Sequence, residues 1–152
     1  LAAAFDLGGR RVEVAHVGRG HTGSDLVVVV PDADLVVVGD LVESAAPPSL
    51  GPDSFLHEWS VTVDSVIGLM TGATRALPGH GDPVDRPYVY EQRGRLAGIA
   101  TELRRLAESG VAADDVAGQG SWAYPLETFA PGLAVAYTQL AQVAPRRTLP
   151  LA

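Results

Sequence analysis

A chain of 152 residues, 47% of them hydrophobic, is long enough to form one domain with a sizeable core. The formal net charge of −7 argues against a general nucleic-acid-binding protein and against a protein that binds an anionic membrane, and no apolar run reaches transmembrane length. Cysteine is absent, so disulfides and thiolate ligands are excluded, and any metal site must use nitrogen and oxygen atoms. The composition does not fix the compartment, and a cytoplasmic location is the working expectation.

Five stretches in the first half of the chain are predicted to be β-strands, because apolar residues are concentrated in them and turns containing Gly, Pro or Asp separate them. These stretches are Ala2–Leu7, Val12–Val17, Leu26–Val30, Leu35–Gly39 and Arg75–Leu77. The pair Gly8-Gly9 predicts a two-residue hairpin between the first two strands, since both positions tolerate positive φ. The third and fourth strands are continuously apolar, which predicts that both of their faces are covered.

One helix is predicted between the fourth and fifth strands, over Phe55–Met70. Asp53 or Ser54 can cap its first turn, and Gly72 can close its last. Its apolar stripe consists of Leu56, Trp59, Val63, Val66, Ile67 and Met70. If the first four strands form an antiparallel meander, this helix returns the chain so that the fifth strand lies parallel to the fourth, as a βαβ crossover.

The rest of the chain is predicted to be helical. One helix starts at Pro87 and ends at Ser109-Gly110, a short helix follows near 113–117, and a further helix starts at Pro131. The inward residues of the two longer helices are Val89, Leu96, Ile99, Leu103 and Leu106, and then Leu133, Ala136, Tyr137, Leu140 and Val143.

Residues 81–87 form the candidate boundary within the chain. They separate residues 1–86, which carry the predicted sheet, from residues 87–152, a helical segment expected to pack on it. Trp122 and Tyr124 lie in a loop of this segment, where they could cover an active site or equally pack the segment onto the sheet.

Three residues carry the chemistry that the sequence points to: His21, Asp40 and His80. Each lies in a glycine-rich turn directly after a predicted strand, in the motifs Gly20-His21-Thr22-Gly23-Ser24-Asp25, Gly39-Asp40 and Pro78-Gly79-His80-Gly81. The strand order brings these turns to one edge of the sheet, which is where open α/β sheets place their sites. Two imidazoles and a carboxylate form a ligand set that zinc or iron accepts. His16 is instead expected to be a satisfied core or edge histidine, and His57 a histidine on a helix surface.

At these positions the chain resembles the metallo-β-lactamase-fold hydrolase superfamily. The G-H-T-x-x-D turn, the apolar strand that ends in G-D and the P-G-H-G loop occur in the order and approximate spacing of that family. The resemblance implies an α/β fold: the second half of an αββα sandwich, with a mixed, largely antiparallel sheet followed by a C-terminal helical segment. It also implies a binuclear zinc site, with iron or manganese as alternatives, in which His21 binds one ion, His80 binds the other and Asp40 bridges them. Thr22 and Gly79 are expected to support these ligands.

The same resemblance implies a hydrolase in which a metal-activated hydroxide attacks the ester, thioester or lactone carbonyl of a small-molecule substrate. The aspartate at position 40 resembles the residue that the glyoxalase II-like, esterase and lactonase branches of the family have at this place. Several β-lactamases of the family have a cysteine there instead. Nucleic acid and membrane are not expected as partners.

One motif of the family is missing from the chain: an H-x-H-x-D-H run does not occur in its 152 residues, which begin with Leu1. We therefore expect a C-terminal half that is inactive without its N-terminal half, which would also supply the carboxylate that orients the hydroxide. Three ligands shared by two ions leave each ion at most two protein ligands. Two alternatives stay open: a non-enzymatic truncated or split-gene fragment, and a nucleic-acid-processing member of the superfamily, against which the acidic charge counts.

Overall fold

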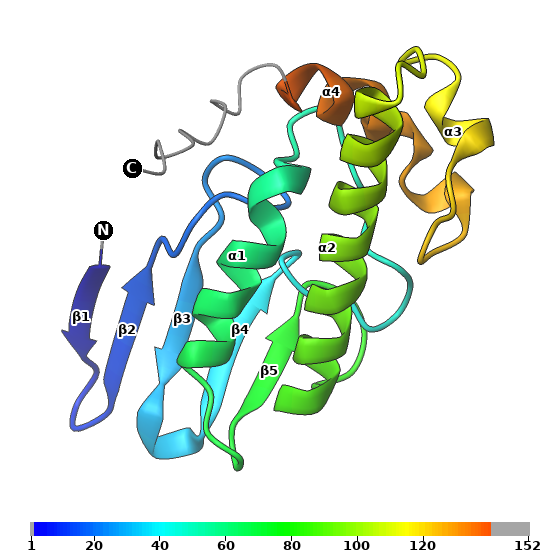
Figure 1. Ribbon diagram of the computed structural model, residues 1–152. Coiled ribbons are helices and arrows are strands. Elements are labelled where there is room, and N and C mark those ends of the chain that lie inside the picture. Colours follow the sequence, from blue (N-terminus) through cyan, green and yellow to red (C-terminus); the bar gives the residue numbers. More distant parts are fainter. Residues whose placement is uncertain (1, 141–152) are drawn as a thin grey trace, which may run out of the picture.

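The computed structural model describes residues 2–140, in which a single five-stranded sheet is covered by helices on one face (Figure 1). The strands are β1 (Ala2–Asp6), β2 (Arg11–Ala15), β3 (Val27–Val30), β4 (Leu35–Gly39) and β5 (Arg75–Pro78). All five predicted strands are confirmed, with small differences at their ends.

The strands lie side by side in chain order, β1-β2-β3-β4-β5. β1 to β4 pair antiparallel and β4 pairs parallel with β5, so the predicted meander and βαβ crossover are both confirmed. Gly8 and Gly9 have φ angles of 71° and 94°, in the left-handed region that a tight hairpin requires. Because β2, β4 and β5 run in one direction, the residues that follow these three strands leave the sheet at the same edge.

Two long helices, α1 (Leu56–Gly68) and α2 (Arg86–Glu108), cover one face of the sheet (Figure 1). The predicted apolar stripes of both helices are buried in full. They form one hydrophobic cluster with the buried residues Val36 and Val38 of β4 and Ala76 of β5. The crossover is therefore stabilised by apolar burial between the helix layer and the central strands.

The ends of α1 differ from the sequence prediction. The N-cap residue is Phe55, which makes no side-chain capping bond, and the C-cap residue is Leu69, so neither of the predicted N-caps nor Gly72 acts as expected. The hydroxyl of Ser54 donates instead to the backbone carbonyl of His21 at 2.7 Å. This contact ties the start of α1 to a distant turn, which a local capping pattern cannot reveal.

The chain beyond α2 contains the helices α3 (Val116–Gln119) and α4 (Ala130–Leu140), with the 3₁₀ turn η2 (Leu126–Thr128) between them. A second 3₁₀ turn, η1 (Pro31–Ala33), connects β3 to β4. Leu133 and Ala136 of α4 are buried, as predicted, whereas Val143 lies outside the described residues.

The two aromatic residues of the C-terminal loop have packing roles. The indole of Trp122 meets the ring of Phe129 edge-on at 5.4 Å and donates from Nε1 to the carbonyl of Ala117 at 3.0 Å. The guanidinium of Arg95, on α2, lies 5.3 Å from the ring centre of Tyr124. These contacts lie within the helical segment itself, so they do not pack the segment onto the sheet as the packing alternative expected, and the role of the two residues at an active site stays a prediction.

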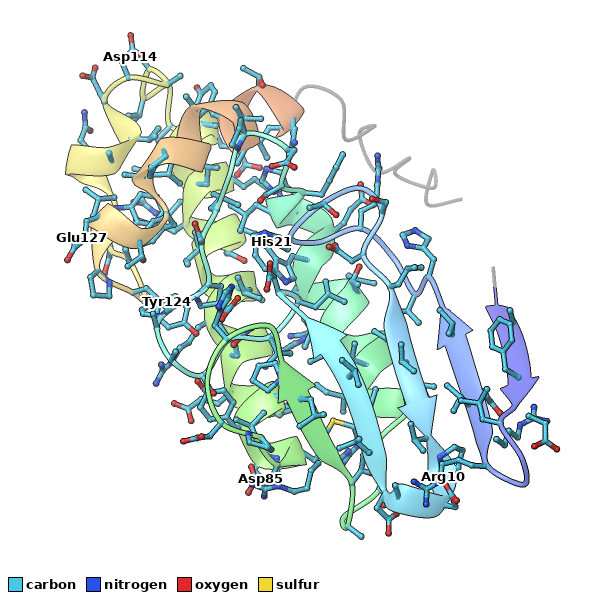
Figure 2. The ribbon with its side chains drawn as sticks, turned by 180° about the vertical axis from the view of Figure 1, so that it is seen from behind. Arg10, His21, Asp85, Asp114, Tyr124 and Glu127 are labelled. Carbon is cyan, nitrogen blue, oxygen red and sulfur yellow. The ribbon has the colours of Figure 1, made fainter. Side chains whose placement is uncertain are left out.

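The face of the sheet turned away from the helices is half-exposed. Successive side chains of β4 alternate, so Val36 and Val38 are buried under the helices while Leu35 and Val37 point to the other side. Figure 2, which views the molecule from behind, shows this open side of the sheet. Both faces of β3 and β4 were predicted to be covered, and within residues 2–140 only the face toward the helices is covered.

None of the helices in the described part of the chain is both long and apolar enough to cross a membrane. The division into residues 1–86 and 87–152 stays a prediction.

Candidate metal centre

Three turns at one edge of the sheet bring together His21, Asp40 and His80. His21 Nε2 lies 3.5 Å from Asp40 Oδ2, and His80 Nε2 lies 3.7 Å from Asp40 Oδ1. The Asp40 carboxylate therefore stands between two imidazole nitrogens, one beside each of its oxygens. In Figure 2 His21 lies just beyond the arrowhead of β4, the strand that leads directly into Asp40. The convergence expected from the strand order is observed.

The turn of His21 is held from several sides. Its carbonyl accepts the bond from Ser54, and its imidazole meets the indole of Trp59 edge-on with ring centres 5.6 Å apart. The carboxylate of Asp25 closes the turn by accepting from the Thr22 N–H at 3.0 Å and from the Thr22 hydroxyl at 2.9 Å. Thr22 thus acts on the neighbouring histidine through the shape of the turn.

The loop that follows β4 is held by side chains from both long helices. The carbonyl of Leu41 accepts from Trp59 Nε1 at 3.1 Å and from Gln92 Nε2 at 3.0 Å. Gln92 Oε1 accepts the N–H of Glu43 at 3.0 Å, and the Tyr88 hydroxyl donates to the Glu43 carbonyl at 2.8 Å. Because Gln92 is only 3% exposed, its amide satisfies two backbone groups inside the core and fixes the loop against α2.

Glycines allow these turns to approach one another closely. A Cβ at position 79 would overlap Asp40 Oδ1 and lie 2.9 Å from both the Cγ and the backbone nitrogen of Asp40. Gly81 has a φ of 101°, and a Cβ there would overlap the backbone and side chain of Ser44. Gly79 therefore leaves room for the Asp40 carboxylate by the absence of a side chain.

A further acidic residue, Glu43, lies at the same place. Its side chain is buried, and one carboxyl oxygen of Glu43, one carboxylate oxygen of Asp40 and one ring nitrogen of His80 lie within 4.8 Å of one another. Burial, and after it the negative charge of Asp40, raises the pKa of Glu43 above its ordinary value.

The donor set fits a divalent cation such as zinc, which accepts imidazole nitrogen and carboxylate oxygen. In residues 2–140 no arginine forms an ion pair with Asp40 or Glu43, so within this range no guanidinium neutralises these carboxylates. His21 Nε2 faces Asp40, while its Nδ1 is buried without a hydrogen-bond partner in the described range. The side chains therefore converge as ligands around a cation do, and their donor atoms suit zinc.

The other two histidines lie apart from this cluster. His16 Nδ1 is 2.8 Å from the carbonyl of Asp25, which confirms a satisfied histidine. The prediction that His57 is a helix-surface residue is wrong: it is half-buried, and its Nε2 lies 2.8 Å from the carbonyl of Ala136 in α4. Burial lowers the pKa of His57. The sequence pattern of α1 could not show this burial, because it comes from α4, which folds back over the first turn of α1.

Sequence reasoning missed Glu43 and Gln92. A signal existed for each. Glu43 is an acidic residue in the short loop that begins with Asp40, and Gln92 is a polar residue at helical spacing between Val89 and Leu96 on the apolar stripe of α2.

Comparison with known proteins agrees with this geometry. Residues 1–91, more than half of the chain, match the family model of the metallo-beta-lactamase superfamily. The chain belongs to this superfamily.

Two curated relatives match the chain over 82 residues. Metallo-beta-lactamase type 2 of Bacillus cereus is 35% identical over a stretch that is 53% of this chain and 32% of that protein. The protein of the same name from Bacillus sp. (strain 170) is 32% identical over the same shares. The chain thus spans about a third of the length of these relatives.

Solved structures agree with the superfamily fold. A metallo-beta-lactamase from Pontibacter korlensis superposes with a TM-score of 0.57 at 26% identity, over 63% of this chain and 46% of that one. The sec-alkylsulfatase Pisa1 from Pseudomonas sp. superposes with a TM-score of 0.74 over 99% of this chain and 28% of that one, and at 16% identity it speaks for the fold alone. The expected α/β fold is confirmed, whereas the glyoxalase II-like branch stays a prediction.

Proposed function

We propose that this chain carries part of the active site of a zinc-dependent hydrolase that acts on the carbonyl group of a small acyl substrate, with an ester, thioester or lactone as the preferred classes. The observation that carries the proposal is the position of the Asp40 carboxylate between the Nε2 atoms of His21 and His80, at 3.5 and 3.7 Å. A carboxylate with an imidazole beside each oxygen is suited to bridge two cations.

In this proposal His21 holds one ion, His80 holds the other, and Asp40 is shared. Zinc at such a site makes hydroxide available near pH 7 and stabilises negative charge on a substrate oxygen, and iron or manganese could serve in its place. Residues of the chain itself fix the orientation of these ligands. The indole of Trp59 packs against the imidazole of His21, and the missing side chain at Gly79 leaves room for the carboxylate of Asp40. Such supporting contacts are expected to affect metal affinity by about 10- to 100-fold.

The remaining ligands and the carboxylate that orients the attacking water are proposed to come from an N-terminal half of the same protein, through the H-x-H-x-D-H motif that the 152 residues lack. The 35% identity with the Bacillus cereus protein supports a β-lactam amide as a second candidate substrate class. The formal charge of −7 argues against nucleic acid as a substrate, and the cytoplasm remains the proposed location.

The test compares Asp40→Ala with Asp114→Ala, a change at an exposed aspartate far from His21 (Figure 2). Zinc content after dialysis and kcat/KM on a panel of an ester, a thioester, a lactone and a β-lactam are measured. The protein is the chain itself and the same chain extended by any coding sequence upstream of Leu1.

We expect Asp40→Ala to lower the amount of zinc retained after dialysis and to lower the kcat/KM of the active protein by more than about 100-fold, because it removes a ligand rather than a supporting contact. Asp114→Ala should leave both unchanged, with circular dichroism confirming that both variants fold. Full zinc content and activity without Asp40 would overturn the proposal.

A further inference from the structure

The buried carboxyl group of Glu43 is not used by the three-ligand set proposed above. Glu43 is 8% exposed, and its carboxyl oxygen lies within 4.8 Å of both an Asp40 oxygen and a His80 nitrogen. The structure gives hydrogen bonds to the backbone of Glu43, from Gln92 and Tyr88. These bonds fix where the backbone of this residue lies and leave its side chain directed toward the other two groups.

Two carboxyl groups this close repel one another when both are ionised, and a positive charge between them or a shared proton relieves the repulsion. Glu43 is buried, whereas the Asp40 side chain is 38% exposed. Within the described range neither Asp40 nor Glu43 has an arginine partner. The imidazole of His80 is close to both groups, but its side chain is 72% exposed and is free to turn toward a ligand. A divalent cation between the three side chains would resolve the repulsion between the carboxylates.

We propose that Glu43 is a metal ligand, and that Asp40, Glu43 and His80 together bind one zinc ion in this chain without ligands from elsewhere. The inference rests on the proposed metal centre and extends its ligand set. Ligand atoms around tetrahedral zinc at about 2.0–2.1 Å lie roughly 3.3 Å apart. The His80 nitrogen and an Asp40 oxygen are already 3.7 Å apart, and the three ligand atoms all lie within 4.8 Å of one another, so closure shortens each separation by at most about 1.5 Å.

The added ligand changes the expected stoichiometry. His21, Asp40 and His80 alone give two ions at most two protein ligands each, whereas Glu43 gives the ion beside His80 three. Three protein ligands and a water molecule are what catalytic zinc sites use. The chain by itself should therefore bind about one zinc ion, and His21 should matter less to this ion than Glu43 does.

The experiment titrates zinc chloride into the metal-free 152-residue chain by calorimetry, with a competing chelator to bring the dissociation constant into range. Glu43→Gln keeps the size of the side chain and removes the carboxylate. Glu91→Gln, at an exposed glutamate of α2, is the matched control. Asp40→Ala, His80→Ala and His21→Ala complete the set.

We expect the unaltered chain to bind about one equivalent, Glu43→Gln to weaken binding by at least about 10-fold, and Glu91→Gln to stay within about twofold. Asp40→Ala and His80→Ala should weaken binding at least as much as Glu43→Gln, and His21→Ala should weaken it less.

Denaturant unfolding gives a second measurement, which separates a ligand from a merely structural residue. Without zinc, Glu43→Gln should be at least as stable as the unaltered chain, because the repulsion between the carboxylates of Asp40 and Glu43 is gone. With zinc it should gain less stability, since the stabilisation by a bound ligand rises with the logarithm of its affinity for the folded state. Reduced stability of the metal-free variant, with an unchanged gain from zinc, would contradict the inference.

The outcomes separate the two proposals. Zinc binding that depends on Asp40 and His80 but not on Glu43 overturns the inference and leaves the proposed function standing. Absence of zinc binding by the unaltered chain also overturns the inference, whereas zinc binding that survives the loss of Asp40 overturns both.

Discussion

The substitution Gly79→Ala tests how closely the turns of the site must approach one another. An added Cβ would overlap Asp40 Oδ1 and lie 2.9 Å from the Cγ and the backbone nitrogen of Asp40. Carbon atoms in contact normally stand about 3.5–4.0 Å apart, so the contact with Cγ alone requires a shift of roughly 0.6–1.1 Å, and the closer contact with Oδ1 requires more. The displaced carboxylate would leave its place between the two imidazole nitrogens and could no longer be shared by their ions.

The expected result is a loss of metal binding without a comparable loss of stability. The Asp40 side chain is 38% exposed and can rotate toward solvent, at a cost of about 0.5–1.5 kcal/mol for a strained rotamer. For a domain of this size that cost lowers Tm by less than about 6 °C. Zinc affinity should fall by at least about 10-fold, which corresponds to about 1.4 kcal/mol.

The assay pairs zinc titration with thermal unfolding of the metal-free protein. Gly72→Ala is the control, since nothing lies within 4 Å of a Cβ at that loop position. Zinc affinity of Gly79→Ala within about twofold of that of Gly72→Ala would refute the view that the missing side chain at position 79 makes room for Asp40.

Two further predictions concern the supports of the fold. Burial lowers the pKa of His57 in the folded protein below its ordinary value of 6.5. As the pH falls through 6.5, the unfolded chain therefore takes up a proton at this residue before the folded chain does. The fold loses stability from that pH down to the lower pKa of the folded state. His57→Gln keeps a donor for the Ala136 carbonyl but does not titrate. Between about pH 7.5 and pH 5 the urea midpoint of this variant should therefore fall less than that of the unaltered chain. Equal changes in the two proteins would contradict the view that protonation of His57 destabilises the fold. Gln92→Leu removes the hydrogen bond accepted from the N–H of Glu43 and the one donated to the carbonyl of Leu41. This loss should lower the free energy of unfolding in urea by about 1–3 kcal/mol and should also weaken zinc binding. An unchanged zinc affinity would show that the loop holds its shape without this amide.

Local patterns were sufficient for most of the elements. The strands and the two long helices follow from apolar content and helical periodicity, and Gly8-Gly9 marks the hairpin by its positive φ angles. The predicted caps of α1 were wrong because the hydroxyl of Ser54 bonds to His21, 33 positions away in the chain. A side chain that can cap locally can equally bond to any backbone group that folding brings near it.

The sequence by itself determined the order and direction of the strands, and with them the meeting of His21, Asp40 and His80. Short connections leave few topologies open, and a residue placed directly after a strand must emerge at that strand's end. Only the tertiary structure decided that Glu43 joins Asp40 and that Gln92 holds the loop. The contacts of Gln92 depend on which face of α2 meets the turn after β4, at separations of 49 and 51 residues. Hydrophobic periodicity records only that a helix face is buried, and it does not record which backbone groups that face meets.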